Sequence, residues 1–378
     1  MRPWRADMIA DPVATLIDRL PGVTAASAGN ARVLDERGEF PDEDVAALTH
    51  IGALAAVVPS SLGGLGIGTE AEYATATAEI LYCIGAGSVA LGRIYEGHIN
   101  ALRLLMLHGT PAQRQVAAAD ALAGELFALW VTDGAESLSF TMTSHGIALH
   151  GDKQFCSAAG HATRAVVTAR EEGGARRLML LPLGHGEHVT ALPAPLQGVR
   201  AAVTGRVDFT GVRHAPECLF GAPNAYLAEP EFSAGAWRAC AIAAGAQSAL
   251  VEAVRDELVA RNRADSPLQR ARLGRMMTHA QTARLWLKHA APLAEAAKRQ
   301  PELAVATVNL MRHALESACL DTIQLAQRTL GLSALQRGNP VERIGRDLAT
   351  YLRQPAPDEA LHEATGYFIA HPYAGGFR

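Results

Sequence analysis

A short segment near the middle of the chain combines a hydroxyl and an aromatic side chain in a pattern that could hold a bound group. In Gly151–Ser157, Phe155 and Ser157 are separated only by Cys156. Because side chains alternate along a strand, Phe155 and Ser157 are expected to face the same side. A fixed hydroxyl can stabilise charge that develops on a ligand. A core phenylalanine beside an exposed serine is the simpler alternative.

A second hydroxyl lies about twenty residues earlier, in the segment from residue 127 to residue 134. There Thr132 directly follows Trp130 and Val131. An ordinary strand threonine would look the same, so this residue becomes a candidate only together with a wider pattern.

Other residue patterns give little support for metal or nucleophilic chemistry. His185 and His188 are three residues apart in a Gly-rich turn without a third ligand nearby, so we predict a solvated loop and no metal site. The five cysteines form no CxxC pair and are predicted to be reduced. The loop 63–66 is Gly-rich but lacks the Lys-Ser/Thr of a phosphate-binding loop.

The charge balance excludes several classes of protein. The 378 residues include 34 Lys and Arg against 38 Asp and Glu, a net charge of −4. A nucleic-acid-binding protein usually carries a basic face, so we expect no nucleic-acid partner. We find no apolar run of about 18 residues and no signal peptide at the start, and we therefore expect a cytoplasmic protein without a membrane span.

Three regions of the chain differ in their periodicity. Residues 1–122 are Ala-rich with helical spacing, residues 123–228 show short β-type runs separated by turns, and residues 229–378 return to long helices. The sequence thus predicts an α+β multidomain protein with an N-terminal helical domain, a central antiparallel β domain and a C-terminal four-helix bundle. The predicted strands begin at residues 139, 146, 164, 177 and 206. The predicted bundle helices are 236–262, 268–291, 303–330 and 358–370.

Five segments, in this order, resemble motifs of the acyl-CoA dehydrogenase family of flavoproteins. The resemblance covers most of the chain from Phe40 onward and includes the family's related flavin monooxygenases. The segments are Val58–Gly66, Gly109–Glu125, Gly151–Ser157, Val207–Gly221 and Pro340–Asp347.

The resemblance implies FAD between the β domain and the bundle, and a homodimer or homotetramer. By position in the motifs, Trp130, Val131 and Thr132 correspond to the segment at the flavin's pyrimidine edge. Phe155 corresponds to the aromatic residue beside the isoalloxazine, and Ser157 to the hydroxyl that reaches N5. Three further cofactor-binding candidates belong to the family's adenine end and its Gln-x-x-Gly-Gly segment, which reaches the flavin of a neighbouring subunit; they are Arg263, Gln327 and Gly331. Arg346 and Asp347 are expected to hold the bundle together as an ion pair.

The family's catalytic glutamate has no counterpart at its usual place. Pro355 stands there, Pro357 replaces the threonine that follows, and Arg238 occupies the alternative position on the first bundle helix. Removing an α-proton from an acyl thioester needs a positioned carboxylate. The catalytic residue therefore stays unknown; candidate bases elsewhere are Glu231, Asp358 and Glu359.

Three interpretations remain open. The first is a FAD-dependent oxidoreductase acting on an acyl thioester of CoA or a carrier protein, with an electron-transfer partner. The second is a flavin monooxygenase supplied by a flavin reductase. The third is a non-catalytic paralogue that partners an active subunit.

Overall fold

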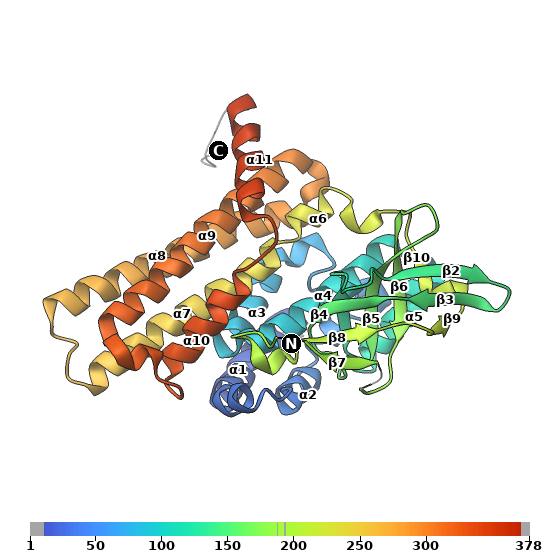
Figure 1. Cartoon of the computed structure of the whole chain (residues 1–378). Coiled ribbons are helices and arrows are strands. Elements are labelled where there is room, and N and C mark those ends of the chain that lie inside the picture. The colour runs from blue at the N-terminus through green and yellow to red at the C-terminus, as the bar shows by residue number, and fades with distance from the viewer. Residues whose placement is uncertain (1–10, 187, 193, 372–378) are drawn as a thin grey trace, which may run out of the picture.

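The computed structural model describes residues 11–186, 188–192 and 194–371. It has a helical N-terminal region, a central β region and a helical C-terminal region, in that order along the chain (Figure 1). This arrangement confirms the predicted fold class. The boundaries at residues 122 and 228 stay a prediction, because one hydrophobic core runs through all three regions.

The N-terminal region is built from helices whose ends carry recognisable caps. Asp11 accepts a hydrogen bond from the Val13 amide at the start of the first helix, and Gly38 ends that helix with a left-handed backbone (φ 67°). Thr110 and Gln113 form a reciprocal capping box before Pro111. The helices are α1 (Pro12–Arg37), α2 (Asp42–His50), α3 (Ala74–Gly87), α4 (Val89–His108) and α5 (Pro111–Leu122).

The larger sheet of the central region is mixed, with most of its pairings antiparallel. Its order is β10-β6-β5-β2-β3-β9, and β1 pairs in parallel with β5 at its side. In β6, Leu178, Met179 and Leu181 are buried, as their unbroken apolar run predicts. The strands are β1 (Phe127–Trp130), β2 (Ser139–Thr143), β3 (Gly146–His150), β5 (Arg164–Arg170), β6 (Arg176–Pro182), β9 (Arg213–His214) and β10 (Leu219–Phe220).

A second, three-stranded sheet has the order β4-β8-β7. It consists of β4 (Asp152–Cys156), β7 (Val189–Ala191) and β8 (Gly205–Asp208). The pairing of β4 with β8 shifts register between Lys153 and Cys156. Such a bulge redirects side chains at the end of a strand.

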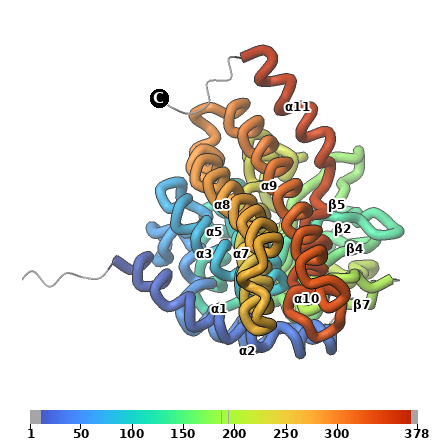
Figure 2. The backbone as a smooth tube through the Cα atoms, turned by 90° about the vertical axis from the view of Figure 1, so that its left-hand side faces the viewer, coloured from blue at the N-terminus to red at the C-terminus, as the bar shows by residue number. Residues whose placement is uncertain are grey.

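Long helices make up the C-terminal region, as predicted, but the fourth helix of the bundle differs from the expected one. The segment Pro340–Tyr351, considered only as a motif, forms helix α10, which packs along α7. Helix α11 (Pro357–Ala370) packs on α9 and projects away from the body (Figure 2). The three long helices are α7 (Trp237–Ala260), α8 (Pro267–Glu295) and α9 (Pro301–Leu330).

Helix α4 lies where the three regions meet. It packs against β1 of the larger sheet, against α7 of the bundle and against α10. No helix in the described part of the chain is both long and apolar enough to cross a membrane.

Candidate active site

Backbone pairing brings Thr132 next to the end of β4. Thr132 lies just after β1, and its carbonyl accepts a hydrogen bond from the Gln154 amide (3.0 Å). A bridge between Asp133 and Lys153 continues this pairing. Thr132 is exposed and adjoins the strand that carries Phe155. The structure therefore unites two segments that the sequence placed twenty residues apart.

The end of β4 departs from the regular alternation that the sequence predicted. Phe155 has a left-handed backbone (φ 56°) at the bulge, and Ser157 lies in the turn after the strand. Phe155 is 47% exposed, Cys156 is buried and Ser157 is half-buried. A bulky residue in this backbone conformation is uncommon and indicates a constraint on the local structure. Phe155 is therefore a surface aromatic, and the alternative of a core phenylalanine is wrong.

Trp130 and Val131 are held by hydrogen bonds to the residues around Phe155. Trp130 is buried and donates its indole N–H to the Ser157 carbonyl (2.9 Å). The Val131 carbonyl accepts a hydrogen bond from the Lys153 ammonium (3.1 Å). These contacts hold both residues in place. The side chains of Thr132 and Phe155 are exposed, and that of Ser157 is half-buried.

Lys153 is a fully buried ammonium beneath the Thr132 segment. It donates to the Asp133 carboxylate (2.5 Å) and to the Thr168 hydroxyl (3.0 Å). Burial lowers the pKa of Lys153, and Asp133 opposes that shift. Burial alone would raise the pKa of Asp133, but Lys153 and Arg176 outweigh it and lower that pKa. The paired charges fix the backbone of residues 131–133.

Charged side chains that the sequence analysis missed face Ser157 from the helices. Arg93 of α4 donates its Nε–H to the Ser157 hydroxyl oxygen (3.3 Å) and a second N–H to Glu96 (3.0 Å). Glu96 is 7% exposed and also accepts from the Tyr351 hydroxyl of α10 (2.9 Å) and from Asn100 (3.0 Å). Two charges three residues apart in an apolar helix were the available signal.

This polar cluster continues deeper into the protein. Arg238 donates to Asn100 (2.7 Å) and to Glu295 (2.7 Å), and Glu295 also accepts from Arg103 (2.5 Å). Burial lowers the pKa of Arg238 to about 10, against the opposing effect of Glu295. Every buried charge in this chain of contacts therefore has a partner, as burial requires.

Comparison with known proteins identifies the family. The sequence model described as "Acyl-CoA dehydrogenase, N-terminal domain" matches residues 23–125, and the one described as "Acyl-CoA dehydrogenase, C-terminal domain" matches residues 235–353. Together they cover more than half of the chain. The chain belongs to the acyl-CoA dehydrogenase family.

Individual relatives are distant or match only in part. The acyl-CoA dehydrogenase homologue YdbM of Bacillus subtilis (strain 168) is 32% identical over 95 residues, which is 25% of this chain and 25% of that protein. Butyryl-CoA dehydrogenase from Megasphaera elsdenii has a TM-score of 0.80 and 16% identity, and the match covers 98% of this chain and 100% of that one. FMN-bound dibenzothiophene monooxygenase TdsC from Paenibacillus sp. A11-2 has a TM-score of 0.84 and 17% identity, covering 94% and 97%. At these identities, the two structures show a shared fold.

The segment around Pro355, which the sequence resemblance aligns with the family's catalytic glutamate, lies on the surface. The Pro355 carbonyl accepts a hydrogen bond from Arg312 (2.8 Å), and residues 353–359 are exposed. Asp358 and Glu359 lie in the exposed first turn of α11, and Glu231 pairs with Lys298 (3.4 Å). Within the described residues, no hydrogen bond or ion pair joins these three carboxylates to Ser157 or Arg93. Glu96, by contrast, is linked to Ser157 through Arg93, which donates hydrogen bonds to both residues.

The remaining cofactor-binding candidates lie at the other end of the bundle. Arg238, near the start of α7, contacts α4, whereas Arg263 follows the end of this 24-residue helix, roughly 35 Å away. Gln327 is near the end of α9 and lines a cavity of about 280 Å³, and Gly331 follows that helix with φ 64°. One chain therefore does not bring Arg263, Gln327 and Gly331 to Ser157.

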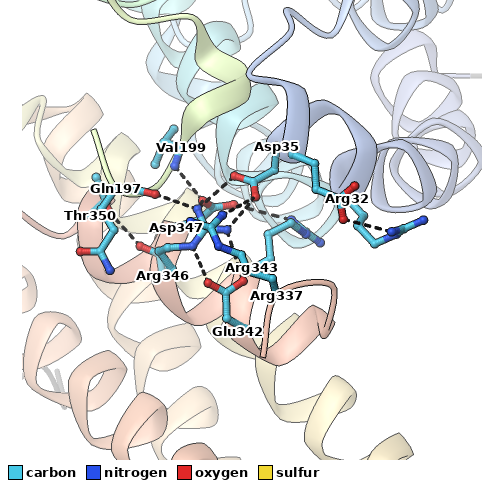
Figure 3. A network of polar contacts seen from close by, with 11 residues as sticks. Arg32, Asp35, Gln197, Val199, Arg337, Glu342, Arg343, Arg346, Asp347 and Thr350 are labelled. Atoms are coloured by element: carbon cyan, nitrogen blue, oxygen red, sulfur yellow. Dashed lines mark hydrogen bonds and ion pairs between the residues drawn. The ribbon is translucent and has the colours of Figure 1, made fainter. Parts of the chain in front are cut away.

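Arg346 binds across regions more than within the bundle (Figure 3). Its guanidinium makes two hydrogen bonds to Asp35 of α1 (3.0 and 2.6 Å) and one to the Gln197 carbonyl (2.8 Å). Asp347 is farther from it (3.7 Å) and accepts from the Val199 amide (2.7 Å). The expected Arg346–Asp347 ion pair exists, but the bonds from Arg346 to Asp35 are shorter and fasten α10 to the N-terminal helix.

Proposed function

We propose that this chain is a flavin-dependent oxidoreductase whose isoalloxazine ring lies against Phe155 and Ser157 and faces α4. The observation that carries the proposal is that an exposed aromatic ring, a hydroxyl and a partly buried charge pair meet at this junction, in a chain of this family. A bound flavin would supply a hydride acceptor or, once reduced, an oxygen-activating group.

The residues present fit a flavin. The Ser157 oxygen accepts from Arg93, so its own O–H is free to donate to a ring nitrogen. Phe155 offers an uncovered aromatic face, and Thr132 offers a second hydroxyl beside it. Lys153 and Trp130 hold the two segments in place, which is the preorganisation that such a site requires.

We propose FAD as the cofactor and a homodimer or homotetramer as the assembly. The support is the family resemblance of Arg263, Gln327 and Gly331, which would serve the flavin of a neighbouring subunit from the far end of the bundle. FMN, named with TdsC, is the competing cofactor. Analysis of flavin released from purified protein distinguishes the two.

We propose an acyl thioester as the substrate, on the basis of family membership. Oxidation at the α and β carbons releases an α-proton and transfers a β-hydride, and the hydride acceptor would be the flavin. The chain must then hold a proton acceptor near Ser157, and Glu96 is the carboxylate at that place.

A flavin monooxygenase is the second candidate. The feature that favours it is the exposed Pro355–Pro357 segment, because the family resemblance aligns Pro355 with the glutamate that α,β-dehydrogenation uses. Oxygenation by reduced flavin does not require that base.

Visible absorbance of the purified protein, with and without added FAD or FMN, tests the proposal. We expect a bound-flavin band. Anaerobic bleaching by an acyl-CoA supports dehydrogenation, whereas O₂-dependent NADH consumption with a separate reductase and a coupled substrate supports oxygenation. Colourless protein under every condition contradicts both and points to the non-catalytic paralogue.

A site variant makes the same experiment specific. Ser157→Ala should weaken flavin binding by roughly tenfold, since it removes a hydrogen bond to the ring. Ser144→Ala, in the exposed turn between β2 and β3, is the matched control and should bind flavin like the unchanged protein.

A further inference from the structure

We propose that Arg93 and Glu96 act as a charge pair in which each residue offsets the other's effect on the redox potential of the bound flavin, and that Arg93 fixes the Ser157 hydroxyl as a donor to it. The inference rests on the proposed flavin site. It assigns positioning and electrostatic roles to two residues of α4.

The hydrogen bond from Arg93 restricts where the Ser157 hydroxyl hydrogen can point. A serine oxygen carries one hydrogen and accepts through its lone pairs. The Arg93 Nε–H occupies one lone pair of Ser157 at 3.3 Å, and guanidinium groups are always donors. The Ser157 hydrogen therefore points elsewhere, and the exposed side of the turn beside Phe155 is where a ring would accept it.

Arg93 and Glu96 are both partly shielded from solvent. The Arg93 side chain is 28% exposed and that of Glu96 is 9% exposed, so solvent screens both only partly. Burial disfavours the charge on Arg93, but Glu96 outweighs it and the pKa of Arg93 is raised. Tyr351 and Asn100 hold the carboxylate on its other sides. The two side chains of opposite charge thus lie within hydrogen-bond distance (3.0 Å) in a partly buried place, so each compensates the other.

The sign of the effect follows from the charge of the flavin. A reduced flavin carries more negative charge than an oxidised one, so a nearby cation favours reduction and a nearby anion opposes it. Glu96→Gln leaves Arg93 unpaired and should raise the potential. Arg93→Gln leaves Glu96 unpaired and should lower it.

Spectroelectrochemical titration of the flavin-loaded protein measures these shifts. Each single variant should change the ratio of dissociation constants for oxidised and reduced flavin by about tenfold, in opposite directions. The double variant Arg93→Gln with Glu96→Gln should return close to the starting potential, since no charge is left unpaired.

A matched control separates this electrostatic effect from general damage. Arg177 pairs with Glu171 (3.2 Å) and is 22% exposed, much like Arg93, but it lies at the β5–β6 hairpin. Arg177→Gln should leave the potential unchanged. Arg93→Lys keeps the charge but lacks the Nε–H, so its potential should stay close to that of the unchanged protein while flavin binding weakens.

The outcomes distinguish the two proposals. If the unchanged protein binds no flavin, both the proposed function and this inference fail. If it binds flavin but the two single variants shift the potential in the same direction, or not at all, the inference alone is overturned.

Discussion

Lys153 shows how a single buried residue can shape the candidate site without touching a ligand. Its ammonium group is fully buried and bonds to Asp133, to Thr168 and to the Val131 carbonyl. A buried charge is tolerated only when its hydrogen bonds are satisfied, and here they are made by the segment that carries Thr132. The proposed flavin site therefore predicts that stability and ligand binding are coupled through this side chain.

Replacing Lys153 with Met should lower the free energy of unfolding by about 3–5 kcal/mol, because it breaks a buried ion pair and leaves Asp133 without its closest partner. Flavin binding should weaken as well. Denaturant unfolding and flavin titration measure the two effects. The exposed Lys288→Met is the control and should change stability by less than about 0.5 kcal/mol. Equal effects of the two variants would contradict the role of Lys153.

His98 predicts a pH dependence of stability. The Phe127 amide donates to Nδ1 of His98 (3.1 Å), so Nε2 carries the proton and donates to the Leu54 carbonyl (3.0 Å). Burial lowers the pKa of His98 to about 4, while the hydrogen bond to Leu54 opposes the shift. Between about pH 4 and pH 6.5, the unfolded chain thus binds more protons than the folded one.

His98 should therefore make no pH-dependent contribution to the free energy of unfolding above about pH 6.5. As the pH drops from 6.5 to 4, this residue should lower the free energy of unfolding by about 3 kcal/mol. Unfolding experiments at several pH values measure this slope. His98→Gln removes the titrating group, so its curve should be flatter in that window. Parallel curves for the two proteins would argue against a buried neutral His98.

At the scale of helices, two glycines allow α3 and α7 to cross closely. A Cβ atom on Gly245 would lie 2.0 Å from the Tyr82 carbonyl oxygen, and one on Gly85 would lie 2.4 Å from the Ile242 carbonyl oxygen. Both obstacles are backbone atoms, which cannot move aside as a side chain can. Gly245 lies inside the predicted helix 236–262, where glycine would ordinarily weaken a helix.

Gly245→Ala should consequently destabilise the protein, although alanine is the better helix former. We expect a loss of at least about 2 kcal/mol, since the helices must separate. Gly274→Ala in α8 is the matched control: its Cβ would meet nothing within 4 Å, so the variant should gain up to about 1 kcal/mol. Thermal unfolding measures both, and a stabilised Gly245→Ala would rule out the close crossing.

At the scale of the whole molecule, the candidate cofactor-binding residues divide between two distant places. Thr132, Phe155 and Ser157 lie where the β region meets α4, whereas Gln327 and Arg263 lie at the far end of the bundle. A second subunit would have to bring the latter group to the first subunit's flavin. We propose such an assembly on the basis of the family resemblance.

Gln327→Ala should then weaken FAD binding by roughly tenfold and leave FMN binding unchanged, because only the adenine half of FAD would reach the neighbouring subunit. Fluorescence titration with each flavin measures the difference. Gln324→Ala, one helical turn earlier, serves as the control. An equal loss of affinity for FAD and FMN would contradict a contact between Gln327 and the adenine half of FAD. It would indicate that Gln327 acts elsewhere in the site or has a structural role.

The sequence by itself determined the order of the three regions, most strand positions and the family. These features follow from local periodicity and from short motifs, which can be recognised without knowing which distant residues are in contact. Helix α10 was missed because its twelve residues read as a motif, and β7, β9 and β10 because two or three residues carry no period.

Only the tertiary structure decided which charges meet at the candidate site. Arg93 and Glu96 look like ordinary helix charges until β4 and α10 place Ser157 and Tyr351 against them. The outward turn of Phe155 likewise depends on a register shift between β4 and β8. The Arg93–Ser157 and Glu96–Tyr351 contacts join residues 64 and 255 positions apart in the chain, so no local pattern can encode them.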